Sequence, residues 1–439
     1  MSNEMQKIGF QSTRFRTVQG VMHYVNEQTL TRAHQKQSSK KAVGVDGINK
    51  ADFDKDAAQQ VKLLTEQMLR HQYRVQPVRR VYIPKTGGKL RPLGIPAYRD
   101  RLVQSVMADI LTAVYEPRFL NCSCGFRPGT GVHEAVRYIN RTVMTRRVNY
   151  VLEADIKGFF DNVNHDWLMK FLAHDIEDAN FLRYVRRFLK AGIMEETELA
   201  PSDKGTPQGG QISPVLANVY LHYALDLWVE KVLRKHVKGE IYYVRYADDF
   251  LLMFQYKEEA EKALQALRLR MEKFNLELAE EKTRIIPFGR WKGNKEKFDC
   301  LGFTFYNTRT RKGSYRLGIR TSTKKMQNKL KAAKEWMKGR MHAPVRETMK
   351  LLGKSIIGHD SYYGINGNAD GLAKFRWRLG LIVFRVLNRR SQRKSLTYDK
   401  FNQIWNANIP KAKIRVDIWS QRLFEEPNAG KPHVRFCEG

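Results

Sequence analysis

The chain has 439 residues, of which 42% are hydrophobic, so it can form about two to four domains and is too apolar to be largely disordered. Lysine and arginine number 78 against 45 acidic residues, and the net charge of +33 favours nucleic acid as a partner over an anionic membrane surface or a role in solubility alone. The four cysteines form no C-x-x-C pair, which excludes a zinc ribbon, and the lack of a signal peptide or a long apolar stretch predicts a soluble intracellular protein without a membrane partner.

The N-terminal part of the chain is predicted to be mainly helical up to about residue 75. An extended pattern over 78–83 follows, and Gly87-Gly88 then indicates the turn of a β-hairpin. Further along the chain, apolar residues recur at helical spacing. They predict helices over 100–115, 166–172, 214–227 and 257–274.

Acidic residues occur where short apolar runs end. One run stops at Asp155, and two others flank the sequence Tyr-Ala-Asp-Asp at 246–249. The flanking runs predict two strands joined by a tight turn, with Asp248 and Asp249 at its tip. These strands are predicted over 150–154, 241–245 and 250–254.

The composition changes near residue 307. Between residues 311 and 350, thirteen lysines and arginines stand against only two acidic residues. Apolar residues in this segment keep helical spacing, which predicts a helix with one packed face and one cationic face. They are Met326, Leu330, Ala333 and Met337. A second basic helix is predicted over 372–388.

Asp155, Asp248 and Asp249 are the strongest candidates for chemistry. Adjacent carboxylates repel one another unless a cation compensates them. Mg²⁺ prefers hard oxygen ligands of this kind, and two such ions about 4 Å apart can activate an attacking hydroxyl and stabilise a departing pyrophosphate. An exposed acidic β-turn is the alternative interpretation. The flanking apolar strands and the third carboxylate favour a site for two Mg²⁺ ions, for which Mn²⁺ can substitute.

Residues 246–249 resemble the signature of reverse transcriptases, in the form found in proteins encoded by group II introns. Five further blocks occur in the order typical of that family, and together the blocks cover about residues 40–305. They lie at 83–96, 125–129, 155–161, 205–214 and 301–303. The resemblance implies an α+β right-hand polymerase: fingers of helices and a β-hairpin, a palm whose antiparallel sheet carries residues 246–249, and a helical basic thumb.

The resemblance also implies a division of the chain into four parts. They are an N-terminal extension with the fingers and part of the palm over 1–150, the palm with fingers insertions over 151–306, the thumb or maturase domain over 307–390 and a short tail over 391–439. The tail could contact DNA or brace the thumb.

Two features of the C-terminal third depart from the fullest form of the family. Residues 358–363 resemble a block of the maturase domain, but His359 stands where many members have Trp. Cys437 is the only cysteine in the tail, so the metal-bearing endonuclease module of some members is not expected.

The resemblance assigns roles to individual residues. The expected catalytic residues are Asp155, Asp248 and Asp249, and these three with Ile156 are the expected metal ligands. Residues expected to bind the incoming nucleotide are Lys85, Arg91, Ile156, Phe159, Phe160, Gln208 and Lys282. Residues expected to bind template or primer are Arg127, Pro207, Gly209, Gly210, Tyr246, Leu301 and Gly302. Residues expected to bind RNA through the thumb are Lys324, Lys325, Tyr362 and Tyr363.

Some of these assignments have both a physical basis and an alternative. Lys85 and Arg91, on the two arms of a hairpin, could clamp a triphosphate or could be solvated basic residues. The ring of Phe160 would exclude a 2′-hydroxyl and so select deoxynucleotides, or it could be part of the core. Lys282 could neutralise phosphates or lie free on the surface. Arg127 could contact the template or a neighbouring carboxylate.

The implied activity is that of an RNA-directed DNA polymerase that adds deoxynucleotides to a primer and, as the product of a mobile group II intron, assists splicing and retrohoming. Two alternatives are open: a reverse transcriptase recruited to phage defence or to a diversity-generating element, and a maturase that acts mainly as an RNA-binding splicing cofactor. The intact set of three carboxylates favours an active polymerase over a protein that only binds RNA.

The same resemblance implies the partners and the location. The expected partners are an RNA template, intron RNA, a DNA primer or target DNA and deoxynucleoside triphosphates, with a homodimer as an open option. The expected location is the cytoplasm of a bacterium, in association with a ribonucleoprotein or the nucleoid.

Overall fold

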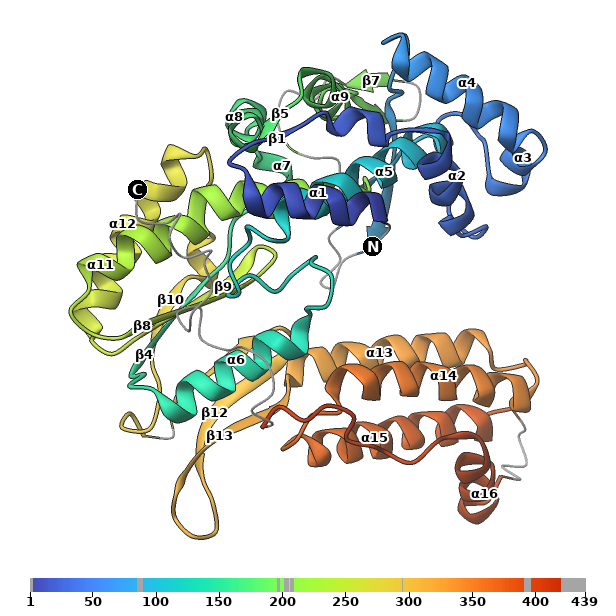
Figure 1. The fold of residues 1–439 in the computed structure, drawn as a ribbon. Coiled ribbons are helices and arrows are strands. Elements are labelled where there is room, and N and C mark those ends of the chain that lie inside the picture. The colour runs from blue at the N-terminus through green and yellow to red at the C-terminus, as the bar shows by residue number, and fades with distance from the viewer. Residues whose placement is uncertain are drawn as a thin grey trace.

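The computed structural model describes residues 3–84, 90–195, 198–200, 205, 209–293, 295–390 and 396–419. Figure 1 shows three groups of elements: helices of the N-terminal part, a central antiparallel sheet with its covering helices, and a C-terminal helical bundle that extends from the sheet as a separate arm. This mixed architecture confirms the expected α+β class. None of the helices in the described ranges combines the length and the apolar character that a membrane span requires.

The N-terminal helices pack around α5 (Tyr98–Tyr115), most of whose side chains are buried. They are α1 (Asn3–Arg14), α2 (Glu27–Lys36), α3 (Lys50–Asp54) and α4 (Ala57–Leu69). Helix α2 begins at a capping box, in which the side chains of Asn26 and Thr29 each accept a hydrogen bond from the other residue's backbone amide. The hydroxyl of Ser12 on α1 donates to the Val114 carbonyl oxygen of α5 at 2.5 Å. The predicted helical N-terminal region is therefore confirmed.

The predicted hairpin consists of β2 (Val78–Pro84) and β3 (Leu90–Ile95), which pair antiparallel with Ile83 opposite Arg91. β6 (Ile193–Glu195) joins β2 in parallel, and β7 (Glu198–Ala200) completes a four-stranded sheet. The turn predicted at Gly87-Gly88 lies outside the described residues.

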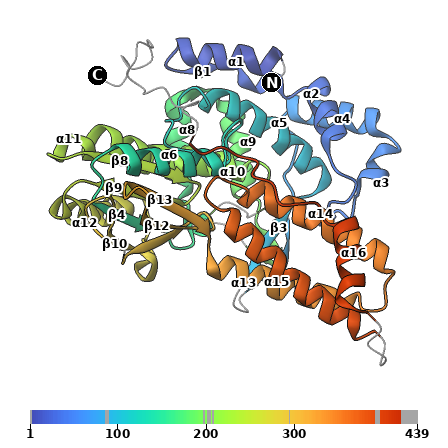
Figure 2. The ribbon, with the colours of Figure 1, turned by 90° about the horizontal axis from the view of Figure 1, so that it is seen from below.

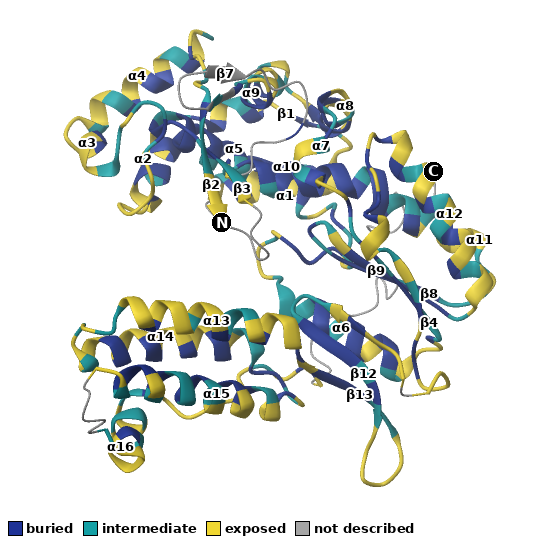
Figure 3. Cartoon of the chain, turned by 180° about the vertical axis from the view of Figure 1, so that it is seen from behind, coloured by how far each residue is buried: buried dark blue, intermediate teal, exposed yellow. Residues whose placement is uncertain are grey.

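The central sheet has the strand order β10-β4-β9-β8, and all of its neighbours are antiparallel. Its strands are β4 (Tyr150–Ala154), β8 (Ile241–Tyr246), β9 (Asp249–Phe254) and β10 (Arg284–Pro287). Successive side chains of β9 enter two different cores: Leu252 packs in the core that contains α5, and Leu251 packs in a second core on the opposite face. Because both faces are buried, these strands read as almost continuous apolar runs (Figure 3).

Helices cover both faces of the central sheet. The larger core includes residues of α8 (His165–Asp175), α10 (Ser213–Leu221) and α12 (Lys257–Lys273). The opposite core includes residues of α6 (Val132–Thr145). The remaining short elements are β1 (Val18–Gln19), η1 (Val21–Tyr24), α7 (Phe159–Asn162), β5 (Ile176–Glu177), α9 (Ala179–Leu189), the π-helical turns η2 (His222–Asp226) and η3 (Val229–Leu233), α11 (Arg234–His236) and η4 (Glu280–Lys282).

A second antiparallel sheet lies beside α6 and has no counterpart in the sequence-based prediction. It consists of β11 (Lys297–Cys300), β12 (Phe303–Arg309) and β13 (Tyr315–Thr321). Phe305 and Ile319 pack in the same core as α6 and the central sheet. Residue 307, where the sequence indicated the start of the C-terminal domain, therefore lies inside a strand. The change in composition there marks an exposed cationic hairpin and not the end of a packed unit.

The C-terminal bundle has a hydrophobic core of its own. Its helices are α13 (Thr323–Gly339), α14 (Val345–Tyr363), α15 (Ala369–Asn388) and α16 (Tyr398–Asn408). Met326, Leu330 and Met337 are buried on one face of α13, while Lys324 and Lys325 are exposed, as the helical spacing predicted. The two predicted basic helices are therefore confirmed.

Residues 411–419, which follow α16, run back along the bundle towards α6 (Figures 1 and 2). We call this segment the strap. The backbone amides of Arg415 and Val416 donate to the Gly364 carbonyl oxygen at 2.7 and 3.0 Å, at the end of α14. Arg137 on α6 donates to the Asp417 carbonyl oxygen at 3.2 Å. Of the two roles that the sequence left open for the tail, the strap's contacts favour bracing over DNA binding.

Candidate active site

The Tyr-Ala-Asp-Asp sequence forms the turn between β8 and β9. Tyr246 pairs with Asp249, so Ala247 and Asp248 are the two residues of the turn. Ala247 has a φ of 56°, in the left-handed region that residues with a β-carbon rarely adopt. The surrounding contacts must therefore stabilise this turn.

β4 brings a third carboxylate to the turn. Ala154 lies opposite Phe250, so the next residue in this register, Asp155, adjoins Asp249. The pKa of Asp249 is raised to about 7, first by burial among protein atoms and then by the negative charges of Asp248 and Asp155. The side chain of Asp249 nevertheless keeps exposed surface, so solvent moderates the effect.

A positive charge lies beside the three carboxylates. The ammonium group of Lys282 forms an ion pair with Asp155, and this hydrogen bond raises the pKa of Lys282. Lys282 ends η4, and the residue before η4 is fixed to the loop after β4, because the Ala279 amide donates to the Asp155 carbonyl oxygen at 2.8 Å. The structure thus brings Lys282 together with the carboxylates.

Ile156 is held beside the same segment. It forms an antiparallel bridge with Leu278, and the hydrogen bonds of this bridge are made by the flanking residues, Asp155 and Lys157. In such a pair the central residue's own N–H and C=O groups point away from the neighbouring strand. The Ile156 side chain is buried, so only its backbone is available to a ligand.

The donor set fits a divalent ion that is shared with a substrate. Among the described residues, no group of three or more His, Cys, Asp or Glu side chains is arranged to hold a metal ion by itself. Mg²⁺ commonly takes one or two carboxylates and completes its coordination with water and substrate phosphates. Burial raises the pKa of Asp249 most, the charges of Asp248 and Asp155 raise it further, and Lys282 lowers it. Asp155, Asp248 and Asp249 therefore offer carboxylate oxygens in one place to an ion that also binds a substrate.

Arg245 supports the turn from inside the protein. Its side chain is fully buried and pairs with Asp226 of η2, with Nη2–Oδ2 and Nε–Oδ1 distances of 2.6 and 2.7 Å. It also donates to the carbonyl oxygen of Ala247 in the turn at 2.9 Å, to Asn218 Oδ1 at 2.9 Å and to Ser123 Oγ at 2.8 Å. Arg245 thus links the turn to α10, η2 and the segment around Ser123.

That segment, residues 122–125, lies alongside β8 like an additional short strand. Ser123 forms a parallel bridge with Arg245, whose N–H and C=O bond to Cys122 and Cys124, both at 2.8 Å. At its end, Gly125 approaches the turn so closely that a β-carbon there would lie 2.4 Å from the Ala247 nitrogen. The turn therefore rests directly on the backbone of this segment.

Comparison with known proteins places this site in a family. The family described as reverse transcriptase (RNA-dependent DNA polymerase) matches residues 83–305, about half of the chain, and this range contains all three carboxylates and Lys282. The chain belongs to the reverse transcriptase family. The resemblance noted in the sequence motifs is confirmed.

The relatives include proteins of group II introns. Protein YkfC of Escherichia coli is 34% identical over 62% of this chain and 78% of its own length. Group II intron-encoded protein LtrA of Lactococcus lactis subsp. cremoris is 32% identical over 58% of this chain and 52% of its own length. Nuclear intron maturase 3 of Arabidopsis thaliana is 27% identical over 37% of this chain and 25% of its own length. The chain thus spans about half of LtrA and a smaller part of the plant maturase.

Several residues of the reverse-transcriptase motifs lie outside the described residues or beside the gaps between them. Lys85, Pro207 and Gln208 are outside the described residues. For Arg91 the structure describes the backbone alone, which pairs with Ile83. Gly209 has a φ of 118°, and a β-carbon there would lie 2.5 Å from the Gly94 carbonyl oxygen, so the loop that holds Gly209 and the buried Gly210 meets strand β3 backbone to backbone. This close approach requires glycine.

The two adjacent phenylalanines of the reverse-transcriptase block at 155–161 have different surroundings. Phe159 is 2% exposed and packs against Tyr220, so its side chain belongs to the core and not to a nucleotide site. Phe160 is only half-buried, with its ring edge-on to that of Phe126 at 6.5 Å. Of the two, Phe160 is the one with a face available to a ligand.

Arg127 is occupied within the protein. Its Nη2 lies 2.8 Å from Glu116 Oε1, and its Nη1 donates to the carbonyl oxygens of Leu120 and Ser123, both at 2.7 Å. The side chain is only 6% exposed. Of the two partners that the sequence allowed, the geometry favours the neighbouring carboxylate over the template.

Tyr362 and Tyr363 join the bundle to the second sheet. The ring of Tyr362 stacks on Phe303 at 5.9 Å, and its hydroxyl donates to the Leu301 carbonyl oxygen at 2.9 Å. Tyr363 packs edge-on against Phe303, and a β-carbon on Gly302 would lie 2.9 Å from the Tyr363 hydroxyl. These contacts favour a packing role for both tyrosines over the RNA contact expected from the sequence.

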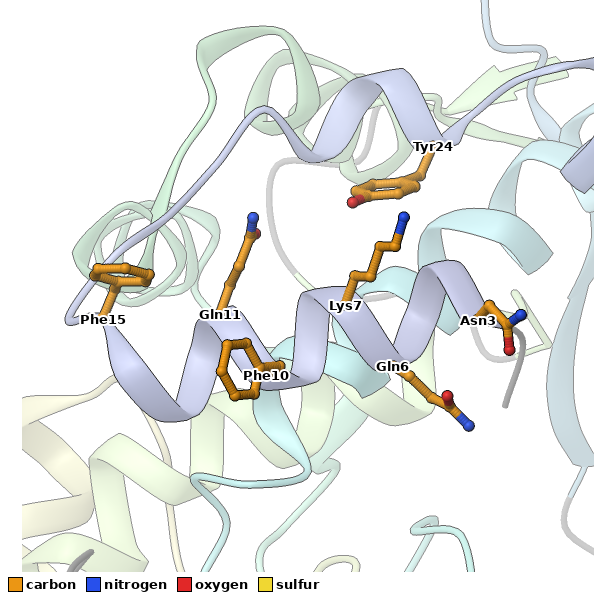
Figure 4. Close-up of a pocket in the computed structure, with 7 residues that line it drawn as sticks. All are labelled: Asn3, Gln6, Lys7, Phe10, Gln11, Phe15 and Tyr24. Atoms are coloured by element: carbon orange, nitrogen blue, oxygen red, sulfur yellow. The ribbon is translucent and has the colours of Figure 1, made fainter.

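Arg245 and Asp226 are the site residues that sequence reasoning missed. One signal was available: a single arginine inside the apolar strand β8 cannot be buried without a counterion, so it predicts a paired carboxylate elsewhere in the chain. Nothing in the sequence identifies Asp226 as that partner. A shallow hollow along α1, lined by Asn3, Gln6, Lys7, Phe10, Gln11, Phe15 and Tyr24, contains none of the predicted site residues (Figure 4).

Proposed function

We propose that this chain is an RNA-directed DNA polymerase whose active centre is formed by Asp155, Asp248 and Asp249. The observation that carries the proposal is the convergence of the three carboxylates at the end of the central sheet, with Lys282 paired to Asp155. Family membership supports the same chemistry. Adjacent carboxylates, one of them with a raised pKa, destabilise a folded protein, and groups of this kind are concentrated at functional sites.

In the proposed reaction, the 3′-hydroxyl of a primer loses its proton to water and its oxygen attacks the α-phosphorus of a deoxynucleoside triphosphate. A phosphodiester bond forms as the bond from the α-phosphorus to the bridging oxygen breaks, and pyrophosphate leaves. Asp155 and Asp249, with the backbone carbonyl of Ile156 and with Asp248, would hold two divalent metal ions, Mg²⁺ or Mn²⁺, which when bound offset the negative charge of the reacting groups. Lys282 would move from Asp155 towards the phosphates, since an ammonium group can pair with either anion. Phe160 would lie against the sugar and exclude a 2′-hydroxyl.

We assign the parts of a right-hand polymerase as follows. The N-terminal helices and the β2–β3 hairpin would be fingers, the central and second sheets with their helices the palm, and α13–α16 the thumb. This assignment moves the start of the thumb to about Ser322, where β13 ends and α13 begins. Lys324 and Lys325 would then contact the backbone of a nucleic-acid duplex from the first turn of α13.

A role in a group II intron is the second part of the proposal. LtrA is named as a group II intron-encoded protein, and another relative is named as an intron maturase. We infer that this chain is encoded by a mobile group II intron, binds its RNA, and assists splicing and retrohoming in a bacterial cytoplasm. The net charge of +33 supports RNA as a partner.

Primer extension by purified protein tests the polymerase. We expect extension of a DNA primer on an RNA template with Mg²⁺ and deoxynucleotides, little extension with ribonucleotides, and a loss of at least about a thousandfold in Asp248→Ala. RNA affinity should stay within about twofold, because one carboxylate adds little to backbone binding. The control is Asp166→Ala, which removes an 82% exposed carboxylate and should extend normally. Extension at the wild-type rate by Asp248→Ala would refute the proposed active centre.

A further inference from the structure

A surface away from the proposed active centre combines dense positive charge with exposed aromatic rings. We propose that it binds a second segment of RNA, an unpaired loop or bulge of a folded RNA, outside the polymerase site. The surface comprises the end of α6 with the residues after it, the loop after β10, and the β12–β13 hairpin. We call it the lateral surface and define it as residues 141–150, 288–293 and 305–315. The inference rests on the proposed function, since it assumes that the chain works on RNA.

The lateral surface is rich in cations. Its three segments contain eight lysines and arginines and no acidic residue, whereas the average composition of the chain would place about three acidic residues there. Within the described residues, five of these cations form no ion pair with a carboxylate. They are Arg290, Lys292, Arg309, Arg311 and Lys312. Cations on α12 differ, since Arg268 pairs with Glu280 at 2.8 Å. Unpaired cations attract phosphates because binding releases the counterions of the nucleic acid.

Aromatic rings alternate with these cations. The guanidinium of Arg290 lies 5.7 Å from the ring centroids of both Trp291 and Tyr315. The ammonium of Lys292 lies 4.7 Å from the ring centroid of Tyr150. Trp291 itself is 59% exposed. An exposed indole flanked by cations can stack an unpaired base while the cations hold its neighbouring phosphates. A regular duplex offers no free base face, so an unpaired segment is the better match.

Specific contacts hold the lateral surface in place. Arg290 Nη2 donates to the Met144 carbonyl oxygen at the end of α6 at 3.2 Å. The side chain of Asn307 on β12 donates to the Gly293 carbonyl oxygen at 2.5 Å and accepts from the Tyr315 hydroxyl at 2.8 Å. Gly289 has a φ of 124°, and a β-carbon there would lie 2.0 Å from the Val148 carbonyl oxygen. Trp291 is therefore presented on a fixed support, which lowers the entropy cost of binding a base.

The lateral surface is distinct from the active centre. Cys300 lies near the carboxylates, since burial and then the charge of Asp249 raise the pKa of its thiol. From there β12 runs for seven residues to Arg309, which places the hairpin tip roughly 20 Å further along at a rise of about 3.3 Å per residue. In Figures 1 and 3 the β12–β13 hairpin extends away from both the bundle and the β8–β9 turn. An RNA segment on this surface would therefore be different from the template nucleotides at the carboxylates.

RNA binding with the active centre occupied tests the inference. The full chain is first loaded with a chain-terminated primer on a short RNA template and the next deoxynucleotide, and a labelled RNA stem–loop is then titrated at several salt concentrations. The test variant is Arg311→Glu/Lys312→Glu at the exposed hairpin tip. The control, Lys262→Glu/Lys273→Glu on the exposed side of α12, makes the same change in net charge. Trp291→Ala and Trp291→Phe test stacking separately.

We expect the hairpin-tip variant to bind the stem–loop about tenfold more weakly than the α12 control and to lose about one to two units of salt slope. Trp291→Ala should weaken binding about fivefold to tenfold, and Trp291→Phe should restore most of it. Equal affinity of the tip variant and the control would overturn the inference, and so would equally tight binding of a fully paired RNA or of the matching DNA stem–loop. Primer extension on a short template should be unchanged in all these variants. A failure of the proposed polymerase would appear there, and the same titration without primer and template would still compare the tip variant with the α12 control.

Discussion

The guanidinium group of Arg245 uses all five of its N–H donors inside the protein. Two go to the carboxylate of Asp226 and one each to Asn218, Ser123 and the carbonyl oxygen of Ala247. Tyr243 also donates to Asp226, at 2.7 Å. A buried ion pair is valuable only when its hydrogen bonds are complete, as they are here. The chemistry at the turn therefore depends on residues that never touch a substrate.

We expect Arg245→Met to lower the free energy of unfolding by about 3–5 kcal/mol, because it leaves the Asp226 carboxylate buried without a counterion. Arg245→Met/Asp226→Asn removes that charge and should recover much of the stability. Primer extension should stay low in the double variant, since the Ala247 carbonyl oxygen still lacks its donor. Chemical denaturation and extension rates measure the two effects. Recovery of activity in parallel with stability would show that Arg245 is merely structural.

Asp249 predicts a dependence of stability on pH. The pKa of its carboxyl group is raised to about 7 in the folded protein, against about 3.9 in an unfolded chain. Between these values the folded protein holds a proton that the unfolded chain has released, so this group destabilises the fold increasingly as pH rises from 4 to 7. Asp249→Asn removes the effect and should raise the Tm at pH 8 without Mg²⁺ by about 1–2 °C, a small change because solvent reaches the side chain.

Three measurements make that prediction decisive. At pH 4 the Tm of Asp249→Asn and of the wild type should coincide. Addition of Mg²⁺ should raise the Tm of the wild type more than that of the variant, since the amide is a poorer ligand. Primer extension by the variant should be lost. A Tm difference that is the same at pH 4 and pH 8 would contradict the assigned cause.

At this scale the sequence predicted the residues whose chemistry is visible in a motif and missed those that act through packing. Asp155, Asp248, Asp249 and Lys282 were predicted, and the structure brings them together. The pairing of Arg245 with Asp226 joins residues nineteen positions apart through a helix and a strand, and no local pattern encodes it. The sequence left two partners open for Arg127, and it assigned RNA binding to Tyr362, whose contacts favour packing. In both cases only the fold shows which groups are near.

At the scale of elements, periodicity predicted the central sheet and the long helices because burial on defined faces leaves an apolar pattern. The strands β12 and β13 were missed because one of their faces is polar and cationic, with Thr308, Arg316 and Arg320 on it. The second sheet therefore looked like the start of a basic helical region. The β2–β3 hairpin was predicted from its glycines, while its side-chain geometry at Lys85 and Arg91 stays a prediction.

The π-helical turn η2 could not be anticipated at all. Asn218 on α10 and Asp226 on η2 both contact Arg245, yet eight residues of regular α-helix would rotate them about 80° apart. The wider π turn between His222 and Asp226 reduces that rotation and brings both side chains to the same face. A departure from regular helix is thus what allows α10 and η2 to support the turn together.

At the scale of the whole molecule, the bundle is held to the rest of the chain at two places. The first is the junction of β13 with α13, where Tyr362 and Tyr363 pack on Phe303 and His133 Nε2 of α6 lies 2.8 Å from the Tyr362 carbonyl oxygen. Its second attachment is the strap, which bonds to Gly364 and reaches Arg137 on α6. Composition predicted a basic C-terminal unit, but the strap follows from no motif, because its backbone bonds and the packing of Ile418 involve partners far away in the sequence.

A β-carbon at Gly364 should displace the strap from the end of α14. At Gly364 a β-carbon would lie 2.3 Å from the Asp360 carbonyl oxygen and 2.8 Å from that of Lys413. We expect Gly364→Ala to reduce processivity on a long template by about fivefold, the effect of a coupling of about 1 kcal/mol, while addition of a single nucleotide stays within about twofold. Gly358→Ala in the same helix is the control, since nothing lies within 4 Å of its β-carbon. Equal processivity of the two variants would contradict a bracing role.

Two attachments also define how the bundle can move. A body fixed at a single point can tilt in any direction, whereas a body fixed at two can only rotate about the line that joins them. For this chain that line runs from the β13–α13 junction to the strap's contact with α6. Rotation about it changes how closely the bundle approaches the central sheet without sliding the bundle sideways. A duplex held between them could therefore be gripped or released while its register with respect to Asp155, Asp248 and Asp249 is kept.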